Sequence, residues 1–152
     1  MLALHDLHIN KVDHRDLKPA NILMYEDGYY AKLADLGLAR QYEHSRVSAS
    51  KNVGTTRYWA PELHKEKPVQ YKSDMFSLGQ LLYFMMTGFV ADIDSALTPP
   101  REYSQGLLDL CEMLLKKDPE ERPMVRELFA KDIIIQTLLS MLSSGKIPRK
   151  KE

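Results

Sequence analysis

The stretch His14-Arg15-Asp16-Leu17-Lys18-Pro19-Ala20-Asn21 brings three kinds of polar group together within a few residues. Asp16 supplies a carboxylate, Lys18 a cation and Asn21 a side-chain amide. Transfer of a phosphoryl group to a hydroxyl needs a carboxylate near the attacking oxygen, positive charge near the phosphate, and oxygen ligands for magnesium. This spacing therefore predicts a phosphoryl-transfer site rather than a polar surface loop.

Short β-rich pieces come directly after this stretch. Residues 21–25 and 29–33 are rich in β-forming side chains, and Glu26-Asp27-Gly28 joins them with a turn sequence typical of a hairpin. Residues 39–51 are polar and rich in serine, which indicates a mobile surface loop.

The rest of the chain has helical patterns. An amphipathic helix end is expected around Leu2 to Ile9, and four more helices are expected at residues 73–87, 107–115, 124–130 and 133–142. In the first of these four, Ser73 and Asp74 are expected to cap the first N–H groups, and Gly88 to end the helix. Its middle is apolar nearly all round, which places it at the centre of a domain. The expected fold is mainly α, a helical bundle with a small β-hairpin.

Residues 14–21 resemble the catalytic-loop signature of the eukaryotic protein kinase family. The lysine followed by proline is similar to the serine/threonine type. The resemblance implies that Asp16 is the catalytic base, that Lys18 steadies the γ-phosphate, and that Asn21 coordinates magnesium. Leu23 would lie beneath the adenine ring of ATP.

A second match, Ala34-Asp35-Leu36-Gly37, follows the expected hairpin. It stands where the kinase family carries Asp-Phe-Gly, so the resemblance implies that Asp35 also holds Mg²⁺, for which a carboxylate is a suitable hard ligand. Leu36 departs from the usual phenylalanine but remains apolar. The segment 54–62 resembles the part of the family that binds protein substrate, and Thr55 within it would hydrogen-bond Asp16 and Lys18.

The same resemblance assigns supporting residues. Asp74 would hydrogen-bond the backbone of the catalytic loop, and Arg122 would form a buried ion pair with Glu62. Arg15 would bind a phosphate added to the activation segment at Ser50. Ser48 and Thr56 are two other residues that could be phosphorylated instead. Alternatively, all three residues are solvated loop positions without a regulatory role.

The resemblance covers nearly the whole chain but only the C-terminal lobe of a kinase domain. We expect residues 1–142 to be a partial kinase domain with the N-terminal β lobe absent, and residues 143–152 to be a basic, flexible tail. No glycine-rich loop of the G-x-G-x-x-G kind is present in the sequence. Between Gly88 and Ser104 the chain is shorter than is usual in the family. The run after Arg122 resembles the NIMA-related kinases.

These observations lead to two functional hypotheses. In the first, the chain is a fragment or truncated form of a serine/threonine protein kinase that uses ATP and Mg²⁺ to phosphorylate protein substrates. In the second, it is a catalytically inactive module that binds proteins as a decoy or regulator. A missing N-terminal lobe or a regulatory protein is an expected partner in either case, because side chains such as Leu23 and Leu36 would otherwise be exposed.

Composition narrows the partners and the compartment. Lys plus Arg and Asp plus Glu both number 21, so the net charge is zero, and neither nucleic acid nor a membrane is an expected partner. The chain has one cysteine and no signal-peptide pattern, which favours a reducing compartment, cytoplasmic or nuclear.

Overall fold

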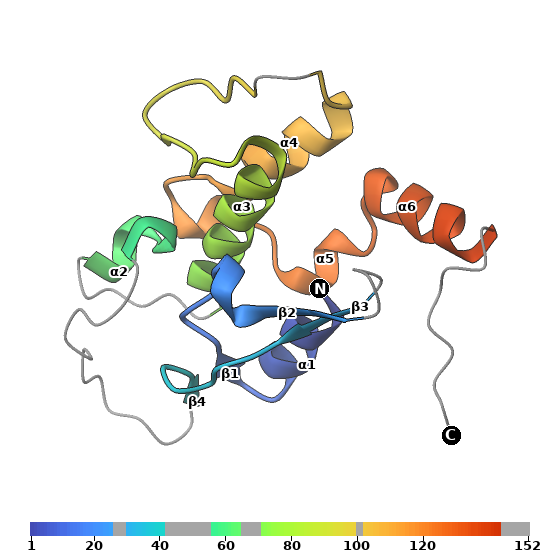
Figure 1. Cartoon of the computed structure of the whole chain (residues 1–152). Coiled ribbons are helices and arrows are strands. Elements are labelled where there is room, and N and C mark those ends of the chain that lie inside the picture. The colour runs from blue at the N-terminus through green and yellow to red at the C-terminus, as the bar shows by residue number, and fades with distance from the viewer. Residues whose placement is uncertain (26–29, 42–55, 65–70, 100–101, 144–152) are drawn as a thin grey trace.

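The structure is a computed structural model, and it describes residues 1–25, 30–41, 56–64, 71–99 and 102–143 (Figure 1). The part of the chain so described is mainly helical, which confirms the predicted class. Its helices and strands are, in chain order, α1 (Leu2–Ile9), β1 (Val12–Asp13), β2 (Ile22–Tyr25), β3 (Tyr30–Leu33), β4 (Arg40–Gln41), α2 (Pro61–His64), α3 (Lys72–Thr87), α4 (Gln105–Leu114), α5 (Val125–Leu128) and α6 (Asp132–Ser143).

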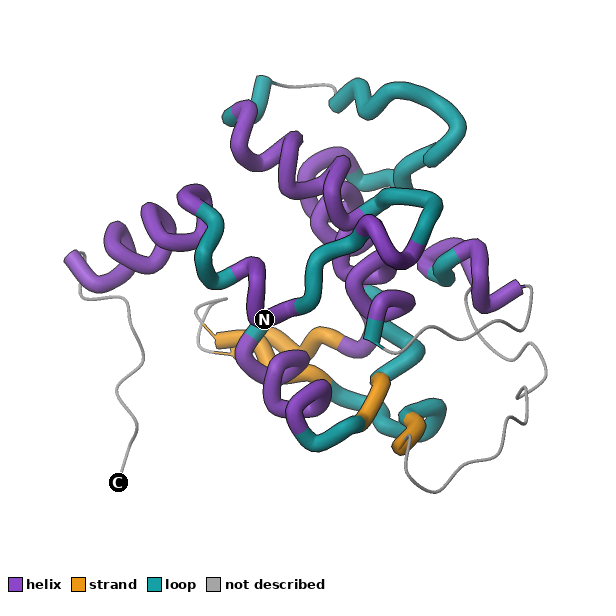
Figure 2. The backbone as a smooth tube through the Cα atoms, turned by 180° about the vertical axis from the view of Figure 1, so that it is seen from behind, coloured by secondary structure: helices purple, strands orange, loops and turns teal. Residues whose placement is uncertain are grey.

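Helix α3 is the centre of the domain, as its apolar sequence predicts. Successive side chains on a helix point about 100° apart, so neighbours can serve different faces. Met75 packs into one apolar cluster with Leu4, Leu110 and Leu128, whereas Phe76 packs into a second. The second cluster also contains Ala60, Tyr83, Ala91, Cys111 and Leu115. The strands gather at the end of the molecule where α3 begins, and segment 88–99 covers the end where it finishes (Figures 1 and 2).

The boundaries of α3 agree with the prediction, but its N-terminal cap does not. Gly88 ends the helix with φ 80°, and its N–H donates to Phe84 O. At the other end the N-cap residue is Tyr71, with φ 62° and no side-chain cap. The predicted capping roles of Ser73 and Asp74 are therefore wrong, because both side chains bind partners far away in the sequence.

The other helices differ from their predicted ranges only at the ends. Helix α4 begins at Gln105 rather than at residue 107, and α6 covers Asp132–Ser143. Helix α5 is shorter than predicted, at Val125–Leu128. No helix among the described residues is long and apolar enough to cross a bilayer.

The predicted hairpin is present. β2 and β3 pair antiparallel from Ile22 opposite Leu33 to Tyr25 opposite Tyr30. A second two-stranded sheet was not predicted: β4 pairs with β1, with Asp13 opposite Arg40. The expectation of a loop from residue 39 is therefore wrong for Arg40–Gln41, and residues 42–51 lie outside the described part of the chain. A strand of two residues has too few side chains to show an alternating pattern.

Candidate active site

The three polar groups of the catalytic-loop stretch meet at the carboxylate of Asp16. Lys18 Nζ lies 2.6 Å from Asp16 Oδ2, and Asn21 Nδ2 donates to the same oxygen at 3.0 Å. Asn21 Nδ2 also donates to the backbone carbonyl of Asp16 at 2.8 Å. A 3₁₀ turn at Pro19–Asn21, closed by Asn21 N–H to Lys18 O, folds the amide back over the carboxylate.

The charge of Asp16 is compensated inside a largely dry site. Asp16 is 5% exposed, and Lys18 is partly buried beside it. A buried carboxylate without a partner is costly, and the ammonium and the amide together offset the cost of burying Asp16. No described residue donates a hydrogen bond to Asp16 Oδ1. Among the described residues, Lys18 and Asn21 hold one carboxylate oxygen of Asp16, and the other oxygen has no hydrogen-bond donor.

Asp74, in the first turn of α3, fixes the backbone of this loop. Its Oδ2 accepts from His14 N–H and its Oδ1 from Arg15 N–H, both at 2.8 Å. The buried His8 lies against it as well, with Nε2 2.9 Å from Oδ2. Arg15 has φ 67°, a conformation that side chains other than glycine rarely adopt, so the two backbone hydrogen bonds offset its strain. The predicted contact of Asp74 with the catalytic loop is confirmed.

Asp13, the residue directly before the catalytic loop, also binds the start of α3. Asp13, buried at 3% exposure, accepts a hydrogen bond from Tyr71 N–H through Oδ1 at 2.9 Å. Tyr71 is the N-cap residue of α3, so Asp13 binds the start of the helix while Asp74 binds the start of the loop. Sequence reasoning missed Asp13 and His8. The sequence feature that could have drawn attention to Asp13 is its position, because it is a carboxylate directly before the catalytic loop in a short β-forming stretch.

Ala34 connects the catalytic loop to the segment that carries Asp35. Ala34 N–H donates to Asn21 O at 2.9 Å, and His14 Nε2 donates to Ala34 O at 3.1 Å. The other ring nitrogen of His14 accepts from Asp16 N–H at 3.3 Å. His14 is fully buried, and these two contacts require its proton to be on Nε2. The arrangement brings the residue before Asp35 onto the catalytic loop.

Asp35 itself projects from a strained backbone. It has φ 63°, its side chain is exposed, and its Oδ1 accepts from Gly37 N–H at 3.0 Å. A Cβ added to Gly37 would lie 2.9 Å from Asp35 Oδ1, so a larger residue here would push the exposed Asp35 side chain aside. Leu36 is 56% exposed and Leu23 is 43% exposed, as the sequence predicted.

Asn21 and Asp35 both carry oxygen atoms of the chemical type that magnesium prefers. No described residue donates to Asn21 Oδ1 or to Asp35 Oδ2, and Mg²⁺ prefers carboxylate and carbonyl oxygens. The structure thus leaves one oxygen on each of the two predicted metal ligands available.

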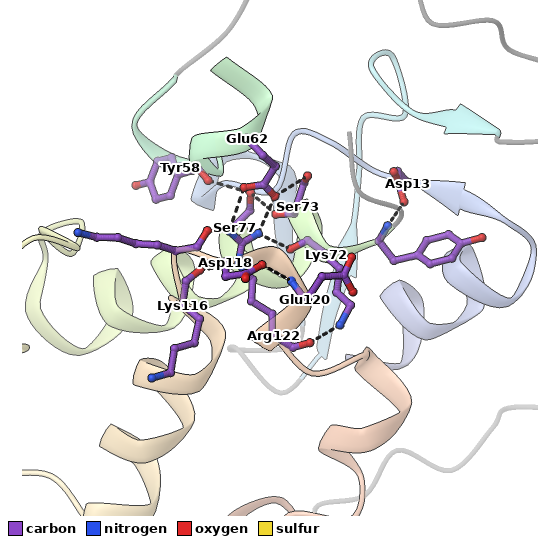
Figure 3. A network of polar contacts seen from close by, with 12 residues as sticks. Asp13, Tyr58, Glu62, Lys72, Ser73, Ser77, Lys116, Asp118, Glu120 and Arg122 are labelled. Atoms are coloured by element: carbon purple, nitrogen blue, oxygen red, sulfur yellow. Dashed lines mark hydrogen bonds and ion pairs between the residues drawn. The ribbon is translucent and has the colours of Figure 1, made fainter. Parts of the chain in front are cut away.

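Arg122 and Glu62 form the predicted buried ion pair at the base of α3 (Figure 3). Arg122 Nη1 lies 2.6 Å from Glu62 Oε1, and Nη2 lies 2.9 Å from Oε2. The remaining N–H groups of Arg122 donate to the carbonyls of Lys72, Lys116 and Lys117. Every donor of this guanidinium has a partner, although Arg122 is only 1% exposed. Ser73 Oγ also donates to Glu62 Oε1, which ties the pair to the first turn of α3.

Some predicted site residues are not covered by the structure. Thr55, Ser48 and Ser50 lie outside the described residues. Thr56 is exposed and begins a 3₁₀ turn that ends at Tyr58. The Arg15 guanidinium forms no ion pair with any described residue, and its predicted contact with a phosphate stays a prediction.

The buried helix and the loop tied to it, with its carboxylate, lysine and amide, can now be compared with known proteins through the amino-acid sequence. The model of the protein kinase domain matches residues 1–134, and the chain belongs to the protein kinase family. It is 36% identical over 158 residues to serine/threonine-protein kinase Nek4 of Mus musculus, which covers 95% of this chain and 20% of that protein.

Other relatives give the same result. Serine/threonine-protein kinase Nek6 of Oryza sativa subsp. japonica is 38% identical over 141 residues, covering 84% of this chain and 26% of the relative. Serine/threonine-protein kinase Nek1 of Mus musculus is 34% identical over 155 residues, covering 93% of this chain and 13% of the relative. The chain thus spans between about an eighth and a quarter of the length of these relatives. The expected similarity to NIMA-related (Nek) kinases is confirmed.

Proposed function

We propose that this chain carries the phosphoryl-transfer residues of a serine/threonine protein kinase that uses ATP and Mg²⁺ and acts on protein substrates. The observation that carries the proposal is the Asp16 carboxylate, held on one oxygen by Lys18 and Asn21 and without a donor on the other among the residues that the structure describes. The names of the relatives support the same activity and the same type of acceptor hydroxyl.

Each residue has a distinct role in this proposal. Asp16 Oδ1 orients the hydroxyl of the protein substrate and takes its proton as the oxygen attacks the γ-phosphorus and the bond to the leaving ADP breaks. Lys18 lies beside it and stabilises negative charge on the transferred phosphoryl group. Asn21 Oδ1 and Asp35 hold Mg²⁺, which supplies positive charge at the phosphates. Leu23 offers an exposed apolar surface for the adenine ring, and Thr55 is assigned by the resemblance to hydrogen bonds with Asp16 and Lys18.

Two measurements test this proposal on the chain joined to an N-terminal kinase lobe, the partner that the sequence leads us to expect. The first is transfer of labelled γ-phosphate from ATP to a serine peptide and to a matching tyrosine peptide, with and without Mg²⁺. We expect Mg²⁺-dependent transfer to serine. We expect Asp16→Asn to lower the rate by about 10²–10⁴-fold, as for loss of a general base, while Asp109→Asn, an exposed carboxylate on α4, leaves it unchanged.

The second measurement is NMR line broadening by Mn²⁺ in the presence of ADP. Broadening should centre on Asn21 and Asp35 and be lost in Asp35→Ala. Absence of both phosphate transfer and metal-dependent nucleotide binding would overturn the proposal.

A second candidate function is an inactive kinase-lobe module that binds protein. It is favoured by the apolar side chains that the hairpin and the following turn expose: Leu23, Met24 at 57% and Leu36. Such a face needs a covering partner or leads to self-association. Sedimentation of the chain alone would show self-association that Met24→Lys reduces. A module of this kind would bind no Mn²⁺ and ADP, so the NMR measurement separates the two candidates.

A further inference from the structure

The segment between α3 and α4 is irregular but firmly attached. Residues 88–99 contain no helix or strand, yet the Gln80 side chain in the middle of α3 binds both polar backbone groups of Ala91. Gln80 Nε2 donates to Ala91 O at 3.1 Å, and Ala91 N–H donates to Gln80 Oε1 at 2.7 Å. Both residues are buried, so this pair of hydrogen bonds is shielded from water.

Further contacts hold the rest of the segment. Asp92 accepts from Asp94 N–H at 3.0 Å and from Ser95 Oγ at 2.8 Å, which closes a tight turn. Lys117 forms an ion pair with Asp94, and Tyr103 donates from its hydroxyl to Met86 O at 2.6 Å. Long connections without secondary structure are uncommon in compact domains and are often functional. One fixed at several points has a shape that exists before any ligand arrives.

This segment and the last turns of α3 line a pocket of about 350 Å³ that is open to solvent on one side. Its apolar lining comes from Tyr83 on the helix and from Phe89, Val90 and Leu97 on the segment. Asp92, Ser95 and Thr98 add polar atoms to the lining. The volume lies within the range of ligand pockets, and an apolar lining with a few polar groups is their usual chemistry. Phe89 is 74% exposed although it lines the cavity, so its ring is available to a partner.

The charge on the lining selects the partner. Hydrogen bonds from Asp94 N–H and the Ser95 hydroxyl lower the pKa of the exposed Asp92 carboxyl, so it is ionised at neutral pH. Lys117 pairs with Asp94 and also acts electrostatically on Asp92, so these two carboxylates share this one cation. A ligand that fills the apolar pocket therefore meets an excess of one negative charge over Asp92, Asp94 and Lys117.

We propose that this cavity is a docking pocket for a protein segment that inserts one large apolar side chain and places an adjacent arginine or lysine on Asp92. The pocket is lined by the last turns of α3 and the segment that follows, and its occupation does not require the proposed phosphoryl transfer. Figure 1 shows that end of the helix far from the strands. The inference therefore stands independently of that activity.

The test uses two capped heptapeptides, Gly-Ser-Arg-Trp-Ser-Gly-Ser and the same peptide with glutamate in place of arginine. Each is titrated into the isotope-labelled chain while backbone amide shifts are followed by NMR. We expect the arginine peptide to shift the amides of Val90, Asp92 and Leu97 and to bind about two- to fivefold more tightly than the glutamate peptide, the range for one exposed charge pair. The amides of His14 and Arg15 should not shift.

Two variants make the assignment specific. Asp92→Asn keeps an acceptor for Asp94 N–H but removes the charge, so it should abolish the preference for arginine. Ala96→Trp places a large side chain at an exposed lining position and should abolish the binding of both peptides. Asp109→Asn, the matched charge control on α4, should change neither result. Shifts that lie elsewhere, the absence of any shift, or equal binding of the two peptides would overturn the proposal.

Discussion

Helix α3 holds an irregular segment at each end, and it does so with different chemistry. Near its start, Asp74 uses a carboxylate to bind the backbone N–H groups of His14 and Arg15. Further along, Gln80 uses a neutral amide to bind both backbone groups of Ala91. Charge-assisted hydrogen bonds are roughly twice as strong as neutral ones. The stronger anchor holds the loop whose backbone is strained at Arg15, whereas Ala91 has no positive φ.

The difference separates two tasks of a single buried helix. The catalytic loop must keep Asp16, Lys18 and Asn21 in one arrangement, and a strained backbone keeps that arrangement only when its surroundings over-determine it. The segment after α3 needs only to be fixed well enough to preserve a cavity.

The largest loss of stability is expected when the buried Glu62–Arg122 ion pair is broken. Arg122→Ala leaves Glu62 buried without its partner and removes donors from three backbone carbonyls. The free energy of unfolding should fall by about 3–5 kcal/mol, measured by urea denaturation followed through Trp59 fluorescence. Lys117→Ala, which removes an exposed ion pair with Asp94, is the control and should cost at most about 1 kcal/mol. Similar losses in the two variants would show that the buried pair has no special weight.

The second largest loss of stability is expected when Asp74, the stronger of the two anchors, is replaced. Asp74→Asn removes the charge and directs amide hydrogens toward N–H donors, so a loss of about 2–3 kcal/mol is expected from weakened hydrogen bonds to a charged group. Hydrogen exchange should accelerate at the His14 and Arg15 amides and stay unchanged at Ala91. Equal acceleration at all three would mean that the two anchors are not independent.

The packing of α3 on α4 gives the third test. A Cβ at Gly79 would lie 2.8 Å from Leu114 Cβ and 3.0 Å from Leu115, so Gly79→Ala should destabilise the fold by about 1–3 kcal/mol through overpacking. In Gly106→Ala the new Cβ would lie 3.5 Å from Ile133, an ordinary contact. That variant should be stabilised by up to about 1 kcal/mol from helix propensity. Thermal unfolding of the two variants should move in opposite directions.

Removing the weaker anchor should have the smallest effect. Gln80→Met keeps most of the side-chain volume but leaves the Ala91 N–H and C=O without their partners, with an expected cost of about 1–2 kcal/mol. Exchange should accelerate at Ala91, and the His14 and Arg15 amides should keep their protection. A loss larger than that of Asp74→Asn would reverse the ranking of the two anchors.

The extent to which the sequence predicts this site depends on separation along the chain. Asp16, Lys18 and Asn21 are close enough that one 3₁₀ turn brings them together, so spacing alone suggested their common role. Asp74 and the Glu62–Arg122 pair came from the family resemblance, because contacts across about 60 residues leave no local pattern.

The wrong and missed predictions also arise from contacts between residues that are distant in the sequence. Ser73 and Asp74 have side chains that favour helix caps, but long-range partners outcompete that local preference in the folded chain. Asp13 and Gln80 were not singled out, because a single polar residue among apolar neighbours does not indicate which distant backbone group it will bind. Strand β4 exists only because β1 lies beside it.

Asp13 hydrogen-bonds Tyr71, and Asp74 hydrogen-bonds His14. These two contacts also determine when the catalytic loop can fold during protein synthesis. The partners are 58 and 60 residues apart, and the loop leaves the ribosome first. At about 5–20 residues per second, some 3–12 seconds pass before the residues that shape it are made. During that interval the left-handed turn at Arg15 has no hydrogen bond from α3 to hold it. The most strained part of the site is thus completed only when the middle of the chain folds back onto its beginning.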